Sequence, residues 1–342
     1  MDNINEENEA VTKLKKLINK TRAHFYKPFQ IAEILYRLRI GTEGIDPLVL
    51  ETYRVKSKVW RDTVTQNLIG KKCTSSSKYQ DNLFDQNACP PEMIKLLNDK
   101  NIREEGSIEK LIYNSFRNKM GQLLECDQYL KKNYSEFSLQ EFLNLFWNNP
   151  GLKRSIDKVF EIVIYAIFQV ISRELDIKST ISVNCTDDKL EKYSDFSKRI
   201  FGINTLSDKI ENKASFYRLG LANASDRGLD MYSNIGSIVQ VKHMFLDKNL
   251  ADSVIDNISA DSIIIVCKAT DDENTQDIMN NPILKEKIKA IITQEDLIAW
   301  YQLCFSEEEL GVEILNIIRT QMQLEFPSMT PLLTSFFAIR KY

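Results

Sequence analysis

The N-terminal third of the chain carries the hydrophobic spacing of helices. Apolar side chains recur at intervals of three and four over residues 6–24, which predicts an amphipathic helix. A second helix is expected over residues 29–39, with Pro28 in its first turn. The pair Asp46–Pro47 predicts the cap and first turn of a third helix, which runs to Leu68. The last two helices and the short glycine-containing turn between them have the outline of a helix-turn-helix element.

The helical pattern continues up to the clearest break in the chain. Residues 92–147 have helical spacing, and Ser138 and Glu141 predict a capping box before the last apolar run. The run Asn148–Gly151 then combines asparagine, proline and glycine, which favour turns. We therefore expect a helical domain over residues 1–150, a second domain over residues 151–305 and a helical segment over residues 306–342.

Beyond this break, helices and strands alternate. An apolar stripe over residues 156–171 predicts a helix, and a short strand is expected at Thr180–Val183. Two strands around a turn and two buried strands are predicted over residues 228–233, 238–243, 262–267 and 290–293. Helical segments separate the later strands, so we expect an α/β fold in which those strands are parallel.

Composition excludes several classes of protein. The chain of 342 residues has six cysteines, none in a CxxC pair, and two histidines, so a structural zinc site and a Cys–His nucleophile pair are not expected. Its apolar runs are too short to cross a bilayer, and its first ten residues are acidic, unlike a secretory signal. We expect a cytoplasmic protein with no membrane contact.

Charge is distributed unevenly along the chain. The net charge is −3, but residues 11–78 sum to +10 and the remainder to −13. A basic block of this kind is typical of a module that binds a polyanion, although a solvated basic face without a partner has the same composition. The small polar loop after the third predicted helix fits either phosphate contacts or an ordinary surface loop. The candidate DNA contacts are Arg54, Lys56, Ser57, Lys58 and Arg61 on the third helix, and Ser75, Ser76, Ser77 and Lys78 in the loop.

The strand pair in the second domain carries the candidate chemistry. Asp230 lies on the first strand, and Gln240 and Lys242 share one face of the second because strand side chains alternate. A carboxylate and an amide oxygen can hold a hard divalent cation, with a lysine beside the attacking water. Phosphodiester hydrolysis needs these groups. A surface hairpin with ordinary polar residues would show the same spacing.

These residues resemble the PD-(D/E)XK nuclease core, in a variant with glutamine at the acidic position. Longer stretches resemble the HaeII-like type II restriction endonucleases over residues 10–305. The matching stretches are His24–Arg37, Leu50–Asp62, Thr74–Phe84, Pro150–Ala166, Ala222–Asn234, Val239–His243 and Ser259–Lys268. The resemblance implies a mixed sheet flanked by helices, joined to a mostly helical N-terminal DNA-binding domain. It also implies Mg²⁺-dependent cleavage of double-stranded DNA at a palindrome with a GCGC core (RGCGCY-like).

The resemblance assigns roles to individual residues. Asp230, Gln240 and Lys242 occupy the catalytic positions, and the first two would hold the metal. Glu161, on the helix before the sheet, is a further candidate ligand, or else a solvent-exposed acid beside Asp157. Arg227 would contact the scissile phosphate or pair with a nearby acid. His243, which follows the motif lysine, is expected to be a packing residue.

The expected protein is therefore a type II site-specific deoxyribonuclease of a restriction-modification system. A palindromic target needs two symmetry-related active sites, hence a homodimer. The resemblance implies a cognate DNA methyltransferase as a genetic partner that forms no stable complex with the enzyme. The alternatives are a non-catalytic helix-turn-helix regulator and a structure-specific repair nuclease.

Overall fold

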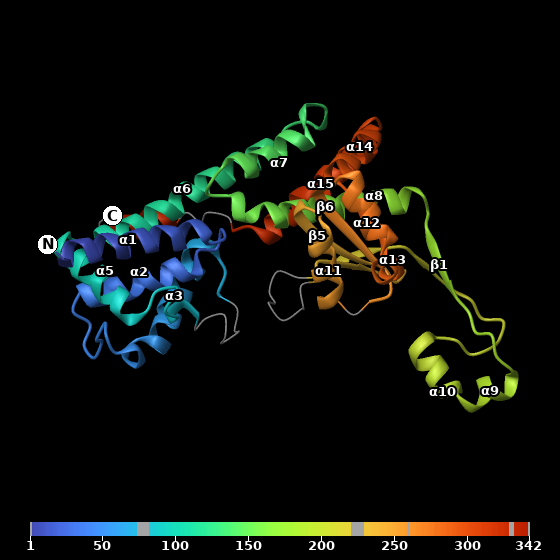
Figure 1. Cartoon of the computed structure of the whole chain (residues 1–342), viewed down its shortest axis with the longest axis horizontal. Helices are drawn as coiled ribbons and strands as arrows, with labels where there is room; N and C mark the ends of the chain where they lie inside the picture. Colours follow the sequence, from blue (N-terminus) through green and yellow to red (C-terminus); the bar gives the residue numbers. More distant parts are fainter. Residues whose placement is uncertain (1, 74–81, 220–228, 259, 328–331, 341–342) are drawn as a thin grey trace. The chain divides into compact units, whose positions relative to one another are not determined.

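The computed structural model describes residues 2–73, 82–219, 229–258, 260–327 and 332–340 (Figure 1). The described residues form two compact units. The first unit contains residues up to Val159 and from Arg319 onward, and the second contains residues from Phe160 to Ile318. The divisions fall inside α8 (Ile156–Glu174) and α15 (Glu308–Glu325). None of the described helices has the length and apolar composition needed to cross a membrane.

The first unit is helical, as predicted for the N-terminal region. α2 packs against α3, α5 and α6. The aromatic rings of Phe25, Phe29, Tyr113 and Phe116 meet at the centre, with the Phe29 and Phe116 ring centroids 4.8 Å apart. Its helices are α1 (Asp2–Lys20), α2 (Tyr26–Arg39), α3 (Arg54–Ile69), α5 (Pro91–Arg103), α6 (Ser107–Leu130), α7 (Leu139–Asn148) and α16 (Leu332–Arg340). Short 3-10 turns lie at Leu50–Thr52, Asn82–Phe84, Tyr134–Glu136 and Lys153–Ser155.

The start of α3 differs from the prediction. The helix begins at Arg54 and not at Asp46. The Asp46 carboxylate accepts a hydrogen bond from the Leu48 amide at 2.8 Å, and the Thr52 hydroxyl donates to backbone carbonyls of the same loop. Such side-chain bonds compete with helix formation. The connection between α2 and α3 is therefore longer than the short turn of a helix-turn-helix, and that part of the prediction was wrong.

The predicted end of α3 is present, whereas only one of the two bonds of the predicted capping box at Ser138 forms. Gly70, with φ of 67°, ends α3 in the left-handed conformation that favours glycine. The Ser138 side chain accepts a hydrogen bond from the Glu141 amide at 3.3 Å and caps α7. The Glu141 carboxylate accepts a hydrogen bond from the Tyr129 hydroxyl at 2.8 Å. Glu141 thus links α7 to α6.

The second unit is built on a five-stranded mixed sheet in the order β3-β4-β5-β6-β7 (Figure 1). β3 pairs with β4 and β4 with β5 in antiparallel fashion, whereas β5, β6 and β7 are parallel. The predicted strand pair and the parallel late strands are confirmed. The strands are β3 (Phe216–Arg218), β4 (Met231–Ser233), β5 (Ile238–Phe245), β6 (Ile263–Ala269) and β7 (Ile288–Ile292).

Helices cover both faces of this sheet. On one face, Ile263, Ile265 and Cys267 of β6 form a buried apolar cluster with α11, α12 and α13. On the other face, α8 packs through Phe168 against Phe216 of β3, and α14 contacts β6. The bounds of these helices are α11 (Lys248–Asn257), α12 (Asp272–Asn280), α13 (Pro282–Lys287) and α14 (Gln294–Phe305). The predicted fold class, a mixed sheet flanked by helices with a helical N-terminal region, is confirmed.

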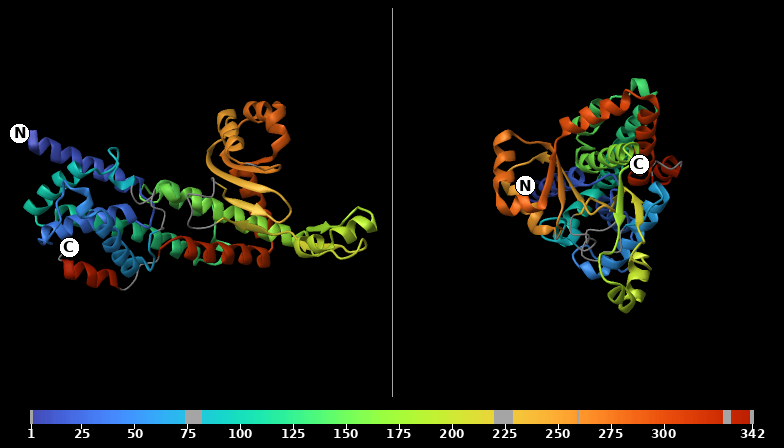
Figure 2. Two further views of the ribbon diagram at one scale, coloured as in Figure 1. Left: turned by 90° about the horizontal axis from the view of Figure 1, so that it is seen from below. Right: turned by 90° about the vertical axis from the view of Figure 1, so that its right-hand side faces the viewer.

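A two-stranded ribbon carries a small helical tip away from the five-stranded sheet (Figures 1 and 2). We call residues 178–213 the arm. The sequence predicted only one of its strands, close to the observed β1. The arm consists of β1 (Lys178–Ile181), α9 (Asp187–Lys192), α10 (Ser194–Phe196), a π-helical turn (Ser197–Phe201) and β2 (Ile210–Lys213).

Candidate active site

Asp230 lies where β4 and β5 diverge. The two strands pair through Met231 with Val239 and through Tyr232 with Ile238. Beyond that point, the carboxylate oxygen Oδ2 of Asp230 accepts hydrogen bonds from Gln240 Nε2 at 2.6 Å and from the Val241 amide at 2.8 Å. The Asp230 side chain therefore accepts the hydrogen bond of a β5 backbone amide at the point where β4 and β5 stop pairing. The structure brings Asp230 and Gln240 together.

Gln240 presents a buried oxygen toward this place. Its side chain is 2% exposed, and its Oε1 atom accepts no hydrogen bond from the described residues. A buried acceptor without a partner is costly, by about 1–3 kcal/mol. An amide oxygen beside a carboxylate is a donor set that hard divalent cations accept. Gln240 and Asp230 thus fit a divalent cation, with the remaining ligands left to water or substrate.

The protein offers few other ligands for such a cation. Among the described residues, no group of three or more histidine, cysteine, aspartate or glutamate side chains could hold a metal ion. The site therefore depends on the amide of Gln240 as well as on the carboxylate of Asp230. A divalent cation in such a site can neutralise phosphate charge and activate water.

Lys242 lies two residues after Gln240, on the same face of β5. Its side chain is half-buried, and its ammonium forms no hydrogen bond or ion pair within the described residues. Cys267 lies directly across from it on β6. Burial raises the pKa of the Cys267 thiol to about 11, so this group stays protonated and is neither a nucleophile nor a metal ligand near neutral pH. Lys242 is thus a basic residue on the same strand face as Gln240.

Glu161 is buried rather than exposed. Its carboxylate is 2% exposed and accepts from Nε of Arg218 at 2.9 Å. This excludes the alternative of a solvent-exposed acid. Arg218 ends β3 and pairs across the sheet with Met231, and the next residue, Leu219, donates its amide to the Asp230 carbonyl at 2.9 Å. Arg218 thus lies on the strand next to β4, close to the point where β4 and β5 diverge.

Arg218 was not predicted from the sequence. Its strand is only three residues long and gives no alternation pattern to detect. A short edge strand after the arm carries no hydrophobic signal of its own. The observation that a buried glutamate on α8 needs a cationic partner would have pointed to a basic residue of the sheet.

His243 is a packing residue, as expected. Its Nε2 atom lies 3.1 Å from Oε1 of Gln294, and its ring meets that of Phe160 at a centroid distance of 4.8 Å. The side chain points to the face covered by α8, opposite to Gln240 and Lys242. It does not reach the cation ligands.

The predicted DNA contacts on α3 divide into exposed and buried residues. Lys56 is exposed, Lys58 is half-buried, and Arg54 is ion-paired with Glu51 at 3.2 Å. The apolar side chains of Val55 and Val59, which the sequence analysis passed over, are exposed on the same helix. This mixture of a cation and apolar groups suits contact with DNA bases and phosphates.

Ser57 and Arg61 are interior residues. Arg61 is 1% exposed and donates through Nη1 to Oε1 of Gln30 at 2.9 Å and through Nε to Asp62 at 2.9 Å. Ser57 accepts from Nε2 of the same Gln30 at 2.9 Å. Both tie α3 to α2, so neither reaches DNA without leaving the interior. We therefore leave both out of the proposed contacts. Ser75, Ser76, Ser77, Lys78 and Arg227 lie outside the described residues.

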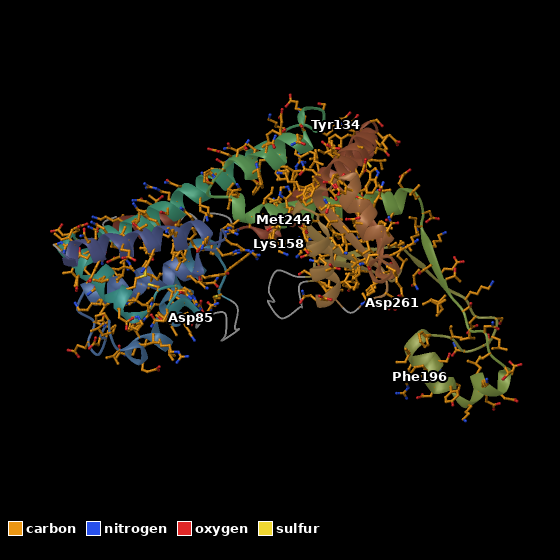
Figure 3. The ribbon with its side chains drawn as sticks, in the orientation of Figure 1. Asp85, Tyr134, Lys158, Phe196, Met244 and Asp261 are labelled. Carbon is orange, nitrogen blue, oxygen red and sulfur yellow. The ribbon has the colours of Figure 1, made fainter. Side chains whose placement is uncertain are left out.

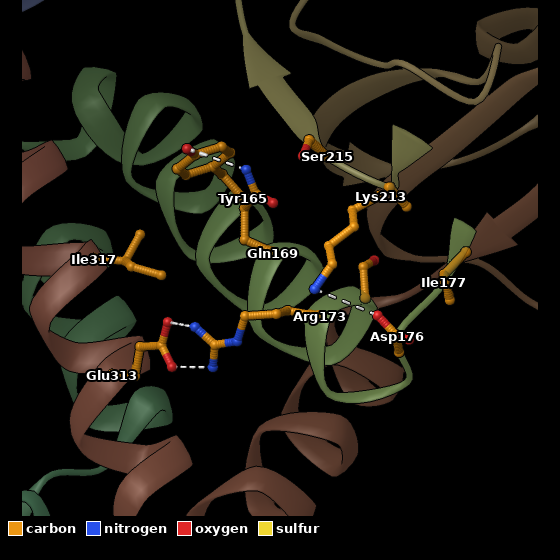
Figure 4. A pocket seen from close by; sticks show the side chains of 11 residues that line it. Tyr165, Gln169, Arg173, Asp176, Ile177, Lys213, Ser215, Glu313 and Ile317 are labelled. Atoms are coloured by element: carbon orange, nitrogen blue, oxygen red, sulfur yellow. Dashed lines mark hydrogen bonds and ion pairs between the residues drawn. The ribbon is translucent and has the colours of Figure 1, made fainter. Parts of the chain in front are cut away.

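A cavity of about 350 Å³ in the second unit is separate from these residues (Figure 4). Its lining comes from α8, α15 and the segment around β2, and it includes the ion pair between Arg173 and Glu313. Lys213 lies 3.6 Å from Asp176 at its rim. Its charged groups are paired with one another, and none of Asp230, Gln240 and Lys242 lines it.

Comparisons with known proteins identify the family of the chain. The model of the HaeII restriction endonuclease family matches residues 10–342. The chain is 40% identical over 345 residues to the type II restriction enzyme HaeII of Haemophilus aegyptius, covering 99% of this chain and 98% of that enzyme. It is 42% identical over 330 residues to the type II restriction enzyme NgoBI of Neisseria gonorrhoeae, covering 95% and 93%. No solved structure matches the chain. The chain belongs to the HaeII restriction endonuclease family.

Proposed function

We propose that this restriction endonuclease makes Mg²⁺-dependent double-strand breaks in DNA at a palindrome with a GCGC core. The observation that carries the chemistry is the unpartnered buried oxygen of Gln240 beside the Asp230 carboxylate, with Lys242 on the same strand face. The GCGC core rests on the likeness of the sequence stretches to HaeII-like enzymes. The assignment of the sheet to the PD-(D/E)XK nucleases is part of the same proposal.

Each residue of the site has a role in phosphodiester hydrolysis. Asp230 and Gln240 would hold the cation through one carboxylate and one amide oxygen. The cation supplies charge neutralisation at the scissile phosphate and lowers the pKa of water when bound. Lys242 holds the attacking water by donating a hydrogen bond and stabilises the negative charge that develops on the phosphoryl oxygens. The water oxygen bonds to phosphorus as the bond to one bridging oxygen breaks.

In this proposal Glu161 is a third ligand, which would bind the cation only when DNA is bound. Its carboxylate is bound to Arg218 in the structure without DNA. A guanidinium group binds a phosphate with the same paired hydrogen bonds that it makes to a carboxylate. We assign Arg218 to the scissile phosphate, which would release Glu161. Because Glu161 lies on the α8 side of the sheet, opposite to Gln240 and Lys242, it would have to reach the cation around the end of β4.

DNA reading belongs to the first unit in this proposal. The exposed side chains of Lys56, Val55 and Val59 on α3 are the contacts that the structure supports. Two copies of the chain would act on the two halves of the palindrome. A cytoplasmic location and a separate cognate methyltransferase stay predictions.

Cleavage of one sequenced plasmid tests the proposal. Wild-type protein with Mg²⁺ should give discrete fragments whose ends map to one palindrome. The Lys242→Ala protein should bind the same site, and its cleavage rate should be lower by a factor of about 10² or more. Random or structure-limited nicking would favour a repair nuclease. If both wild type and Lys242→Ala bind one site specifically and neither cuts it, the protein is a non-catalytic regulator.

A further inference from the structure

The arm has almost no core of its own. Over residues 178–213, all of which the structure describes, the buried side chains are Leu190, Ser197 and Ile203. The ribbon that connects the tip to the sheet has two strands and pairs only β1 with β2. A two-stranded ribbon is marginally stable by itself in water. The ordering of the arm therefore calls for a further surface against which it packs.

The tip of the arm exposes large apolar side chains close together in sequence. Tyr193, Phe196, Ile200 and Phe201 are 58%, 59%, 62% and 44% exposed. The Phe196 and Phe201 rings pack edge to face with centroids 5.8 Å apart, and Phe196 lies on the helical tip in Figure 3. Clustered exposed apolar side chains rimmed by polar residues mark sites of protein association.

The charges around the tip identify the kind of partner. Residues 187–201 contain four acidic and four basic side chains, so the tip is neutral. A neutral surface gains little from a polyanion, whose binding depends on an excess of lysine and arginine. Two copies related by a two-fold axis present the same mixture to each other, so acidic side chains of one can face basic side chains of the other. The balanced charge of the tip therefore favours a second copy of the chain over a polyanion as its partner.

We propose that residues 187–203 form the contact through which two copies of this chain dimerise. Tyr193, Phe196, Ile200 and Phe201 are the centre of that contact, and the mixed charges are its rim. The inference rests on the proposed function, because a palindromic target requires a symmetric pair. It deepens that function by naming the surface that joins the pair.

The same unit has a second apolar surface that could also serve as a dimer contact. A groove lined by Phe168, Phe216, Trp300 and Leu303 lies between α8, β3, α14 and α15, and Leu303 is 70% exposed. Its apolar side chains contact the packed sheet, so it needs no partner to be ordered. It supplies a matched control position for the experiment.

The oligomeric state of the full chain tests the inference without using cleavage. Sedimentation equilibrium should show a dimer for wild type, a monomer or an at least tenfold weaker dimer for Phe196→Glu/Phe201→Glu, and an unchanged dimer for Leu303→Glu. The milder Ile200→Lys should weaken the dimer in the same direction. Thermal unfolding should show that the variants keep the sheet intact.

Two outcomes would overturn the inference. The first is a tip variant that dimerises as wild type does; the second is a dimer lost in Leu303→Glu alone. If wild type is monomeric without DNA, the same comparison is made on a palindromic duplex, with Lys242→Ala added to each variant to prevent cutting. Two copies per duplex for the tip variants would then refute it. Absence of cleavage by wild-type protein would count against the proposed function and leave this measurement intact.

Discussion

One oxygen of Asp230 accepts two hydrogen bonds, and one of them explains why residue 240 is a glutamine. The donor is Nε2 of Gln240, which only an amide can supply. A glutamate at this position would place two carboxylates at hydrogen-bond distance, which raises the pKa of one of them. The neutral amide therefore holds the Asp230 carboxylate without a cation, and its other atom, Oε1, is the oxygen that we propose as a cation ligand.

The variant Gln240→Glu tests this account. In the absence of Mg²⁺ its thermal midpoint should fall, since the bond to Asp230 is lost and like charges meet. Added Mg²⁺ should restore the midpoint, because two carboxylates bind a hard cation more tightly than one. The measurement is thermal unfolding against Mg²⁺ concentration. Equal responses of Gln240→Glu and wild type would place residue 240 outside the cation site.

The ion pair between Glu161 and Arg218 separates a structural role from a catalytic one. Arg218→Met should cost about 3–5 kcal/mol of stability, because it removes the cationic partner of a buried carboxylate. Adding Glu161→Gln should recover most of that loss. If Glu161 also binds the cation, the single variant Glu161→Gln should weaken Ca²⁺ binding to the protein–DNA complex in calorimetry. Unchanged Ca²⁺ affinity would assign Glu161 to Arg218 alone.

The sequence predicted some of these residues and not others, for a physical reason. The contact of Asp230 with Gln240 was predictable because the two residues belong to a strand pair, whereas the catalytic roles of Asp230, Gln240 and Lys242 stay a proposal. The burial of Arg61 was missed because a charge count treats every basic residue as exposed. The Gln30 amide on α2, which makes that burial possible, lies far away in sequence.

At the scale of elements, α3 carries two kinds of basic residue. Lys56→Ala should weaken DNA binding and lower its salt dependence by about one unit of slope, with no change in stability. Arg61→Ala should destabilise the first unit by about 3 kcal/mol, because Gln30 and Asp62 lose their buried partner. Fluorescence anisotropy on DNA and urea unfolding distinguish them. A Lys56→Ala protein that binds as wild type does would remove α3 from the DNA surface.

Elements with a strong pattern were predicted, and elements without one were not. The late strand β6 was found because it begins with a run of isoleucine and valine, and β7 was found from its second half, Ala290–Ile292. The start of α3 was placed too early, since the side chains of Asp46 and Thr52 bind nearby backbone that a helix would otherwise use. The arm, with three buried side chains, has no apolar periodicity to detect.

At the scale of the molecule, acid should destabilise the first unit through His24. Burial, with Lys71 and Arg22 nearby, lowers the pKa of His24 from 6.5 to about 4. The unfolded chain therefore binds the extra proton first, and stability is lost as the pH falls from 6.5 toward 4. The shift corresponds to about 3 kcal/mol at most.

Urea unfolding of wild type and His24→Asn at several pH values measures this contribution. The difference between the two proteins should change across the interval from 6.5 to about 4 and be constant above it. The comparison is clean because the chain has only one other histidine, His243. A constant difference over the whole range would show that His24 titrates normally.

The bond from the Val241 amide to the Asp230 carboxylate has a consequence for selection in cells. In the proposed function Asp230 serves both the strand and the chemistry, so its loss should lower both the amount of protein and its activity. Lys242 serves only the chemistry in this description. A library scored for protein abundance should therefore reject most replacements of Asp230 and accept those of Lys242. In a host without protective methylation, only cells whose enzyme no longer cuts DNA would survive. Variants changed at Lys242 should be enriched among these survivors, because they are folded but inactive.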